Sequence, residues 1–169
     1  HPVTTSYGEG FSQVAKTLEA LKKFKNIQKI VLWPNVDAGS DDVSKGIRVF
    51  RERNMNEPFY YLKNFSPEDY IRVLKHALCC VGNSSSFIRE CSFLGTPAVI
   101  VGDRQEGREH AKNVVYVDYN MDAIEEATQQ QLKHGKYDSD KIFGYGDTGL
   151  KIANELVNLD LTIDKRSTF

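Results

Sequence analysis

The chain has 169 residues and a mass of 19.2 kDa, which is enough for one domain with a substantial hydrophobic core. Its 22 basic residues nearly balance its 23 acidic residues, which excludes a protein that grips nucleic acid through bulk positive charge. The hydrophobic fraction of 40% excludes a disordered chain, and no apolar run approaches the roughly 20 residues of a membrane span. Because the start shows no signal-peptide pattern, we expect a cytoplasmic protein that binds neither nucleic acid nor a membrane.

The first part of the chain alternates helix and strand patterns. Apolar residues recur at helical spacing over residues 8–25, and a continuous apolar run at 29–33 is typical of a buried strand. A polar helix is predicted at 41–53 and a second strand at 59–62. A further helix begins after Ser66, whose side chain can cap it, and the proline that follows suits the first helical position.

The alternation continues to the end of the chain. Strands are predicted at 78–81, 96–101 and 114–117, and helices at 85–94, from 120 or 122 to about 133, and at 148–159. Short strands between longer helices predict one α/β domain, Rossmann-like, with a parallel sheet and helices on both faces. Such folds bind ligands at the carboxyl ends of their strands. The candidate loops are therefore residues 34–40, 63–66, 82–86 and 102–108.

Three cysteines, Cys79, Cys80 and Cys91, stand in apolar surroundings. Their odd number and the absence of a CxxC spacing argue against a disulfide framework and a zinc site, so we expect buried free thiols in a reducing compartment and no metal. The chain begins at His1 without an initiator methionine, which suggests a processed product or an excised domain. A lone terminal histidine is usually a surface residue, and no catalytic Ser/His/Asp or Cys/His set surrounds it.

Loop 82–86 lies between a predicted strand and a helix. Gly82 permits a sharp turn, and the N–H groups and hydroxyls of Ser84 and Ser85 can bind an anion at the helix start. Taken alone, an ordinary turn with a serine cap is the favoured interpretation, since neither a GK[ST] nor a GxGxxG pattern is present. Glu90, on the same helix, can accept ribose hydroxyls, although an ion pair with Arg89 or a nearby lysine is the commoner role for such a residue.

The other loops carry further candidates. Arg104 and Arg108 can bind a phosphate through forked donors or simply belong to a solvated charged loop, and their place after a strand favours binding modestly. Asn35 and Asp37 can reach a ligand or only stabilise their turn. Phe65 can stack on a base, or it can serve as the hydrophobic staple of the cap that follows it.

Four segments together resemble one family. HPVTT, PNVDAGS, GNSSSFIRE and GDRQEGRE occur in the order found in the C-terminal half of UDP-N-acetylglucosamine 2-epimerases, in particular the hydrolysing branch of sialic-acid pathways. The resemblance extends from His1 to about residue 108. It implies the GT-B architecture, in which two Rossmann-like halves enclose the active site. Residues 1–169 would then form the C-terminal, UDP-binding half, with the N-terminal half absent.

The resemblance also implies how the candidate residues bind a UDP-sugar. Ser84 and Ser85 would hold the diphosphate where the helix begins, and Glu90 would take the ribose hydroxyls. Arg104 would contact phosphate. Phe65 would pack on the uracil.

The remaining implied roles concern the reaction. His1 matches the catalytic histidine of the family and faces the sugar and diphosphate, while Asn35 and Asp37 match a loop near the sugar. The family eliminates UDP from UDP-N-acetylglucosamine and adds water to give N-acetylmannosamine, without a cofactor or metal. Carboxylates for the C2 proton belong to the missing half, so we expect this chain alone to be inactive and the full-length protein to be a homo-oligomer.

Two departures leave the substrate open. Phe87 stands where the family usually has glycine, and Asp103 where threonine is common, so a diacetamido-sugar or a GDP-sugar remains an alternative to UDP-N-acetylglucosamine. Two other functions also stay open. A GT-B glycosyltransferase domain shares such a nucleotide site, although HPVTT argues against it. A non-catalytic nucleotide-binding α/β domain would keep the anion site but would not need His1.

Overall fold

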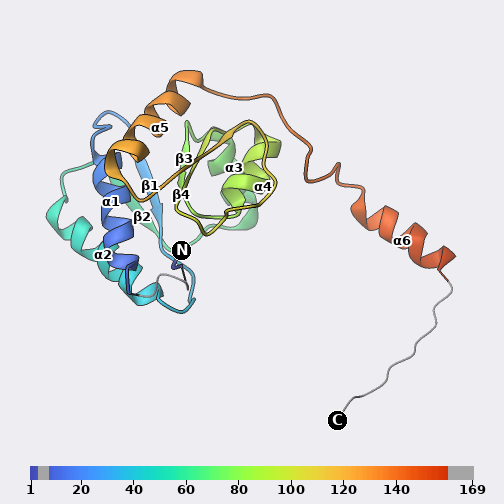
Figure 1. The fold of residues 1–169 in the computed structure, drawn as a ribbon, viewed down its shortest axis with the longest axis horizontal. Helices are drawn as coiled ribbons and strands as arrows, with labels where there is room; N and C mark the ends of the chain where they lie inside the picture. The colour runs from blue at the N-terminus through green and yellow to red at the C-terminus, as the bar shows by residue number, and fades with distance from the viewer. Residues whose placement is uncertain (4–7, 160–169) are drawn as a thin grey trace, which may run out of the picture.

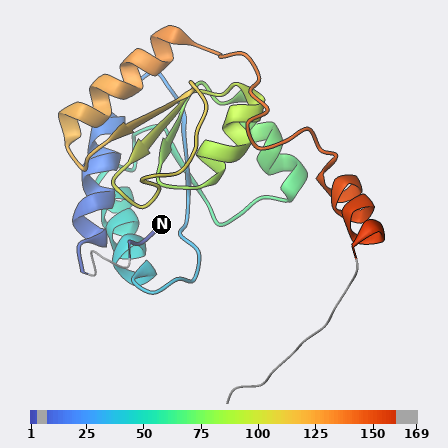
Figure 2. The ribbon, with the colours of Figure 1, turned by 45° about the vertical axis from the view of Figure 1, so that its right-hand side comes forward.

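The computed structural model describes residues 1–3 and 8–159, and the two threonines of HPVTT lie outside these residues. Parallel strands and their connecting helices form the body of the molecule, as Figure 1 shows. The last helix, α6 (Thr148–Asn158), stands away from that body in both views (Figures 1 and 2). The predicted α/β class with parallel strands is confirmed.

The first half of the body is a pair of strands covered by two helices. These elements are α1 (Gly10–Lys22), β1 (Lys29–Leu32), α2 (Ser40–Arg53) and β2 (Phe59–Leu62). The strands are parallel, with Lys29 beside Phe59. One face of the pair carries a core cluster of Leu18, Val43, Ile47, Phe50 and Phe59. Ile30 and Tyr60 are exposed, so in the described residues the helices protect mainly one face of this pair, which differs from the predicted cover on both faces.

The second half of the body has helices on both faces of a three-stranded parallel sheet. Its elements are α3 (Pro67–His76), β3 (Cys80–Gly82), α4 (Ser86–Leu94), β4 (Ala98–Val101), β5 (Val114–Val117) and α5 (Met121–His134). The strand order is β3-β4-β5. Among the described residues β1 and β3 exchange no ladder hydrogen bonds, so the strands form two parallel groups rather than the single sheet that the sequence predicts.

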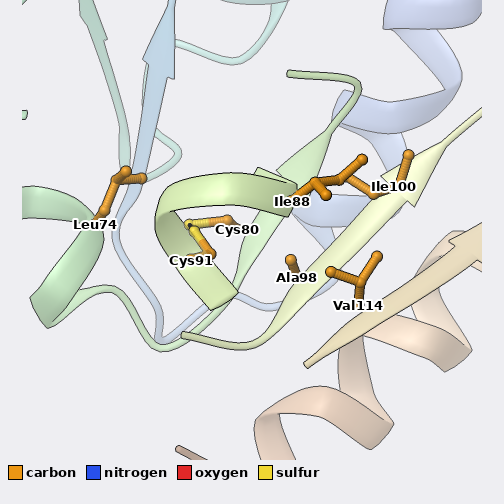
Figure 3. Close-up of a cluster of buried hydrophobic side chains, with 7 residues drawn as sticks. All are labelled: Leu74, Cys80, Ile88, Cys91, Ala98, Ile100 and Val114. Atoms are coloured by element: carbon orange, nitrogen blue, oxygen red, sulfur yellow. Dashed lines mark hydrogen bonds between the residues drawn. The ribbon is translucent and has the colours of Figure 1, made fainter. Parts of the chain in front are cut away.

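Alternate side chains of the fully buried strand β4 supply both faces of this sheet. Ala98 and Ile100 join a cluster with α3 and α4, drawn in Figure 3. Val99 and Val101 join a cluster with Ala20 of α1 and with Ile124 and Ala127 of α5. The period of two in a strand sends successive residues to opposite faces, which explains why a continuous apolar run is needed here.

Two of the three cysteines lie in the first of these clusters. Cys80 and Cys91 are buried free thiols with their sulfur atoms 3.7 Å apart, as expected, whereas Cys79 is half-buried. The hydrogen bond to Cys80 and burial raise the pKa of Cys91, and burial raises the pKa of Cys79 to about 12. Thiols held in their neutral form are poor nucleophiles, so Cys79 and Cys91 serve packing.

Helices α1 and α2 approach closely at Gly46. A methyl group at this position would lie 2.4 Å from Val14 Cγ1 and 3.2 Å from the Phe11 carbonyl oxygen. We expect Gly46→Ala to lower the free energy of unfolding by about 1–2 kcal/mol, because the crowding outweighs the gain of about 1 kcal/mol in helix propensity. Urea titration monitored by circular dichroism measures this change. Gly149→Ala is the matched control, since a methyl group there meets nothing within 4 Å, and it should not destabilise the fold.

Helix α6 buries none of its side chains. Its apolar residues Leu150, Ile152, Leu156 and Val157 are all exposed. None of the helices in the described residues is long and apolar enough to cross a membrane.

Candidate functional site

Three loops that follow parallel strands meet the N-terminal segment at one end of the body. The first follows β1, the second joins β3 to α4, and the third follows β4. The first residue of the chain lies close to these loops in Figure 1. This is the end at which parallel α/β folds bind their ligands.

Asn83 connects these segments through four hydrogen bonds. Its side-chain Nδ2 donates to the His1 carbonyl oxygen at 2.8 Å, and its Oδ1 accepts from the His1 α-amino nitrogen at 2.7 Å. Its own carbonyl oxygen accepts from Arg104 Nη1 at 3.0 Å and from Gln105 Nε2 at 2.9 Å. With only 8% of its surface exposed, Asn83 is a buried polar residue whose amide groups are used within the protein.

His1 lies beside groups of both charges. Its ring Nδ1 is 3.9 Å from Asp37 Oδ2, and this nitrogen is buried without a hydrogen-bond partner in the structure. The cavity next to His1 therefore combines the positive charge of Arg104 with the negative charge of Asp37.

The N-terminus of α4 faces the same region. Ser85 is the residue before the helix, but its side chain makes no capping hydrogen bond. The Ser84 hydroxyl instead accepts from the Ser86 N–H at 3.3 Å. The expected serine contact at the helix start is therefore made by Ser84 rather than by Ser85. The N–H groups of residues 86–89 are all hydrogen-bonded to Ser84 or Ser85, so this helix start offers an anion its dipole rather than free donors.

Glu90 occupies the inner part of α4. Its Oε2 atom is buried and has no hydrogen-bond donor, and no ion pair involves Glu90 in the described part of the chain. The expected ion pair with Arg89 or a lysine is therefore not formed. A buried carboxylate oxygen without a hydrogen-bond donor is energetically unfavourable, and the hydroxyl groups of a ligand can supply the missing donor.

Phe65 and Asn35 make no hydrogen bond with His1, Asn83 or Arg104 in the described residues. Phe65 is half-buried between β2 and α3, and the expected cap after it is confirmed because Ser66 Oγ accepts from the Asp69 N–H at 3.2 Å. Asn35 is exposed, and its carbonyl oxygen accepts from the Asp37 N–H at 2.9 Å, which stabilises the turn. Across the described residues no hydrogen bond or ion pair joins Phe65 or Glu90 to His1 or Arg104.

A cavity of about 570 Å³ lies between the N-terminal segment and the loop after β4. Its lining combines Asp37 and Arg104 with acidic and small neighbours, namely Pro2, Val3, Ala38, Asp103 and Glu106. Asp103 thus brings an additional negative charge next to Arg104, as its place in the sequence suggests. Within the described residues, no group of His, Cys, Asp or Glu side chains is arranged to hold a metal ion.

Sequence reasoning assigned no role to Asn83, Gln105 or Tyr119. Gln105 is 1% exposed, and Tyr119 packs its ring against Gly102. Both residues therefore support the loop that follows β4. Burial raises the pKa of Tyr119, whose hydroxyl has no hydrogen-bond partner in the structure. The contacts of Asn83 span 82 residues to His1 and 21 to Arg104, so no local spacing could have indicated them.

These features define a parallel α/β domain with a charged cavity at its strand ends, lined by Arg104 and by acidic side chains. The sequence profile of the UDP-N-acetylglucosamine 2-epimerase family matches residues 1–157, and the chain belongs to this family. The UDP-N-acetylglucosamine 2-epimerase of Neisseria meningitidis is 34% identical over 149 residues, which are 88% of this chain and 38% of that protein. The GDP/UDP-N,N'-diacetylbacillosamine 2-epimerase (hydrolyzing) of Campylobacter jejuni is 28% identical, over 71% of this chain and 31% of that protein.

A solved structure has the same fold. The UDP-GlcNAc 2-epimerase of Methanocaldococcus jannaschii, in complex with UDP-GlcNAc and UDP, matches with a TM-score of 0.67 at 16% identity, over 89% of this chain and 41% of that one. The chain therefore spans only about two fifths or less of the length of these relatives.

Proposed function

We propose that this chain is the C-terminal, UDP-binding half of a hydrolysing UDP-N-acetylglucosamine 2-epimerase. The observation that carries the proposal is the meeting of His1, Arg104 and the start of α4 around Asn83. A guanidinium and the positive end of a helix dipole suit a diphosphate. Glu90 has a buried oxygen without a donor, which suits ribose hydroxyls. Free cysteines support a reducing compartment such as the cytoplasm for the protein.

The chain's residues would assist the departure of UDP. In the elimination, the C2 proton goes to a base, the C1–O bond breaks, and its electron pair leaves with UDP. Arg104 and the α4 N-terminus would stabilise the negative charge that grows on the diphosphate, and a protonated His1 would help by donating to it. Water then adds across the new double bond. The carboxylates that move the C2 proton would come from the other half of the full-length protein, so this chain should not turn over UDP-N-acetylglucosamine.

Calorimetric titration with UDP, and with GDP for comparison, tests the proposed site. We expect UDP to bind and GDP to give no heat, and we expect Arg104→Ala to weaken UDP binding about 10- to 30-fold because a charge-assisted contact to phosphate is lost. Arg89→Ala removes an exposed arginine from α4 and serves as the control, with UDP affinity unchanged.

The other outcomes are equally informative. Binding of GDP in place of UDP would move the substrate to a GDP-sugar while keeping the site. Equal UDP affinity of the wild type and Arg104→Ala would remove Arg104 from the site. No binding of either nucleotide to the folded chain would contradict a nucleotide site formed by this chain alone.

A further inference from the structure

Asn83 is the one described residue that contacts both His1 and Arg104 through hydrogen bonds. The three residues come from the N-terminal segment, the end of β3 and the loop after β4. Each contact bridges at least 21 residues of sequence, so Asn83 ties together segments that no local structure holds in place.

The side chain of Asn83 fixes the backbone of His1, and not its ring. One amide group donates to the His1 carbonyl oxygen and accepts from the His1 nitrogen, so both polar atoms of that residue's main chain are held at 2.7–2.8 Å. The ring is left with Nδ1 unpartnered beside Asp37. This arrangement fixes the main chain from which the imidazole extends, and it places the ring beside Asp37.

The carbonyl oxygen of Asn83 takes one donor from Arg104 and one from Gln105. A guanidinium has five N–H donors, so one contact orients it and leaves the others for an anion. Gln105 is braced from the sheet, since its own carbonyl oxygen accepts from the Tyr116 hydroxyl at 3.1 Å. Asn83 therefore sits on a rigid support that extends to β5.

We propose that Asn83 is a positioning residue at the diphosphate site, whose side chain holds the His1 main chain, and with it the imidazole, next to the Arg104 guanidinium that its carbonyl oxygen contacts. This inference rests on the proposed function for its purpose, but the geometry that it describes does not depend on a bound nucleotide. Asn83 acts through His1 and Arg104 and need not touch the substrate.

Nuclear magnetic resonance of the His1 ring tests the positioning without any ligand. In the wild type we expect Asp37→Asn to shift the His1 ring signals, because the two side chains are neighbours. In an Asn83→Ala background the same Asp37→Asn change should leave these signals unmoved, since the ring is no longer held beside residue 37. Asp41→Asn removes an equal charge from the start of α2 and should shift the His1 signals in neither background.

The other three histidines, His76, His110 and His134, report whether the variants are folded. Should Asn83→Ala fail to fold, Asn83→Asp provides the same test, because it keeps the acceptor and the size but loses the donor to His1. A His1 signal that still responds to Asp37→Asn in a folded Asn83 variant would overturn the proposal.

UDP titration of the same variants separates this inference from the proposed function. We expect Asn83→Ala to weaken UDP binding about tenfold. We expect Arg104→Lys, in contrast, to leave the response of the His1 ring signals to Asp37→Asn unchanged. Loss of the His1 response in a chain that never binds UDP would support the positioning of His1 and contradict the nucleotide site. Unchanged UDP affinity together with a lost His1 response would contradict a role for this positioning in nucleotide binding.

Discussion

Gly102→Ala will lower the free energy of unfolding by roughly 3–5 kcal/mol, because two costs coincide at this residue. Its backbone has a φ of 79°, in the left-handed region that side chains rarely adopt. A methyl group would also lie 2.3 Å from Cε2 of Tyr119 and 2.6 Å from its hydroxyl oxygen. Since Gly102 leads directly into the Arg104 loop, any relief of this clash must move that loop.

Gly107→Ala separates the two costs. Gly107 has a similar φ of 75°, but a methyl group there meets nothing within 4 Å, so only the backbone strain of about 1–2 kcal/mol applies. Chemical denaturation of both variants gives the comparison. Equal losses of unfolding free energy at the two positions would show that the Tyr119 ring moves aside without an energetic penalty. The close packing of Gly102 against Tyr119 would then not contribute to stability.

Gln131→Met will lower the free energy of unfolding by roughly 2–4 kcal/mol, because a buried amide is replaced by a side chain of similar length without donors. Gln131 is 2% exposed and its Nε2 donates to the carbonyl oxygens of Ala98 at 3.2 Å and Asn113 at 3.0 Å. Its Oε1 accepts from the Tyr137 hydroxyl at 2.7 Å. This amide therefore fastens α5 to the starts of β4 and β5 and to the segment after the helix.

Gln130→Met provides the control for this prediction. Gln130 lies next to it on α5, but it is exposed and bonds only to Glu126 of the same helix. Its replacement should change the unfolding free energy by no more than about 0.5 kcal/mol. Calorimetric unfolding of the two variants decides the matter, and a loss below 1 kcal/mol for Gln131→Met would mean that water replaces the amide.

Local patterns in the sequence predict most elements of the fold because each has a local cause. The apolar run of β4 marks a strand with both faces covered, and Ser66 caps α3 as its position suggests. Asn120, one of two predicted starts, caps α5 by accepting from the N–H groups of Asp122 and Ala123 at 3.0 Å. The division of the described strands into two groups, without hydrogen bonds between β1 and β3, could not be predicted, because spacing along the chain indicates strand direction but not which edges exchange hydrogen bonds.

The candidate site shows the same division between local and distant causes. The loops after the strands were predicted from the fold class, and His1, Asp37 and Arg104 are gathered as the loop positions suggest. The roles of Asn83 and Gln105 could not be predicted, because they depend on partners far away in the sequence. A polar residue in a turn is also commonly there only to stabilise the turn. The roles of Ser84, Ser85, Glu90 and Phe65 in binding remain predictions.

The burial of Ala20 has a consequence for the order of events during synthesis. Ala20 of α1 is covered by β4 and by Ile124 and Ala127 of α5, and Lys23 forms an ion pair with Glu125, 102 residues further along. During synthesis, this side of α1 therefore stays exposed to solvent until residue 127 has left the ribosome. Closing so long a loop slows folding, and the nascent chain must avoid aggregation throughout that interval.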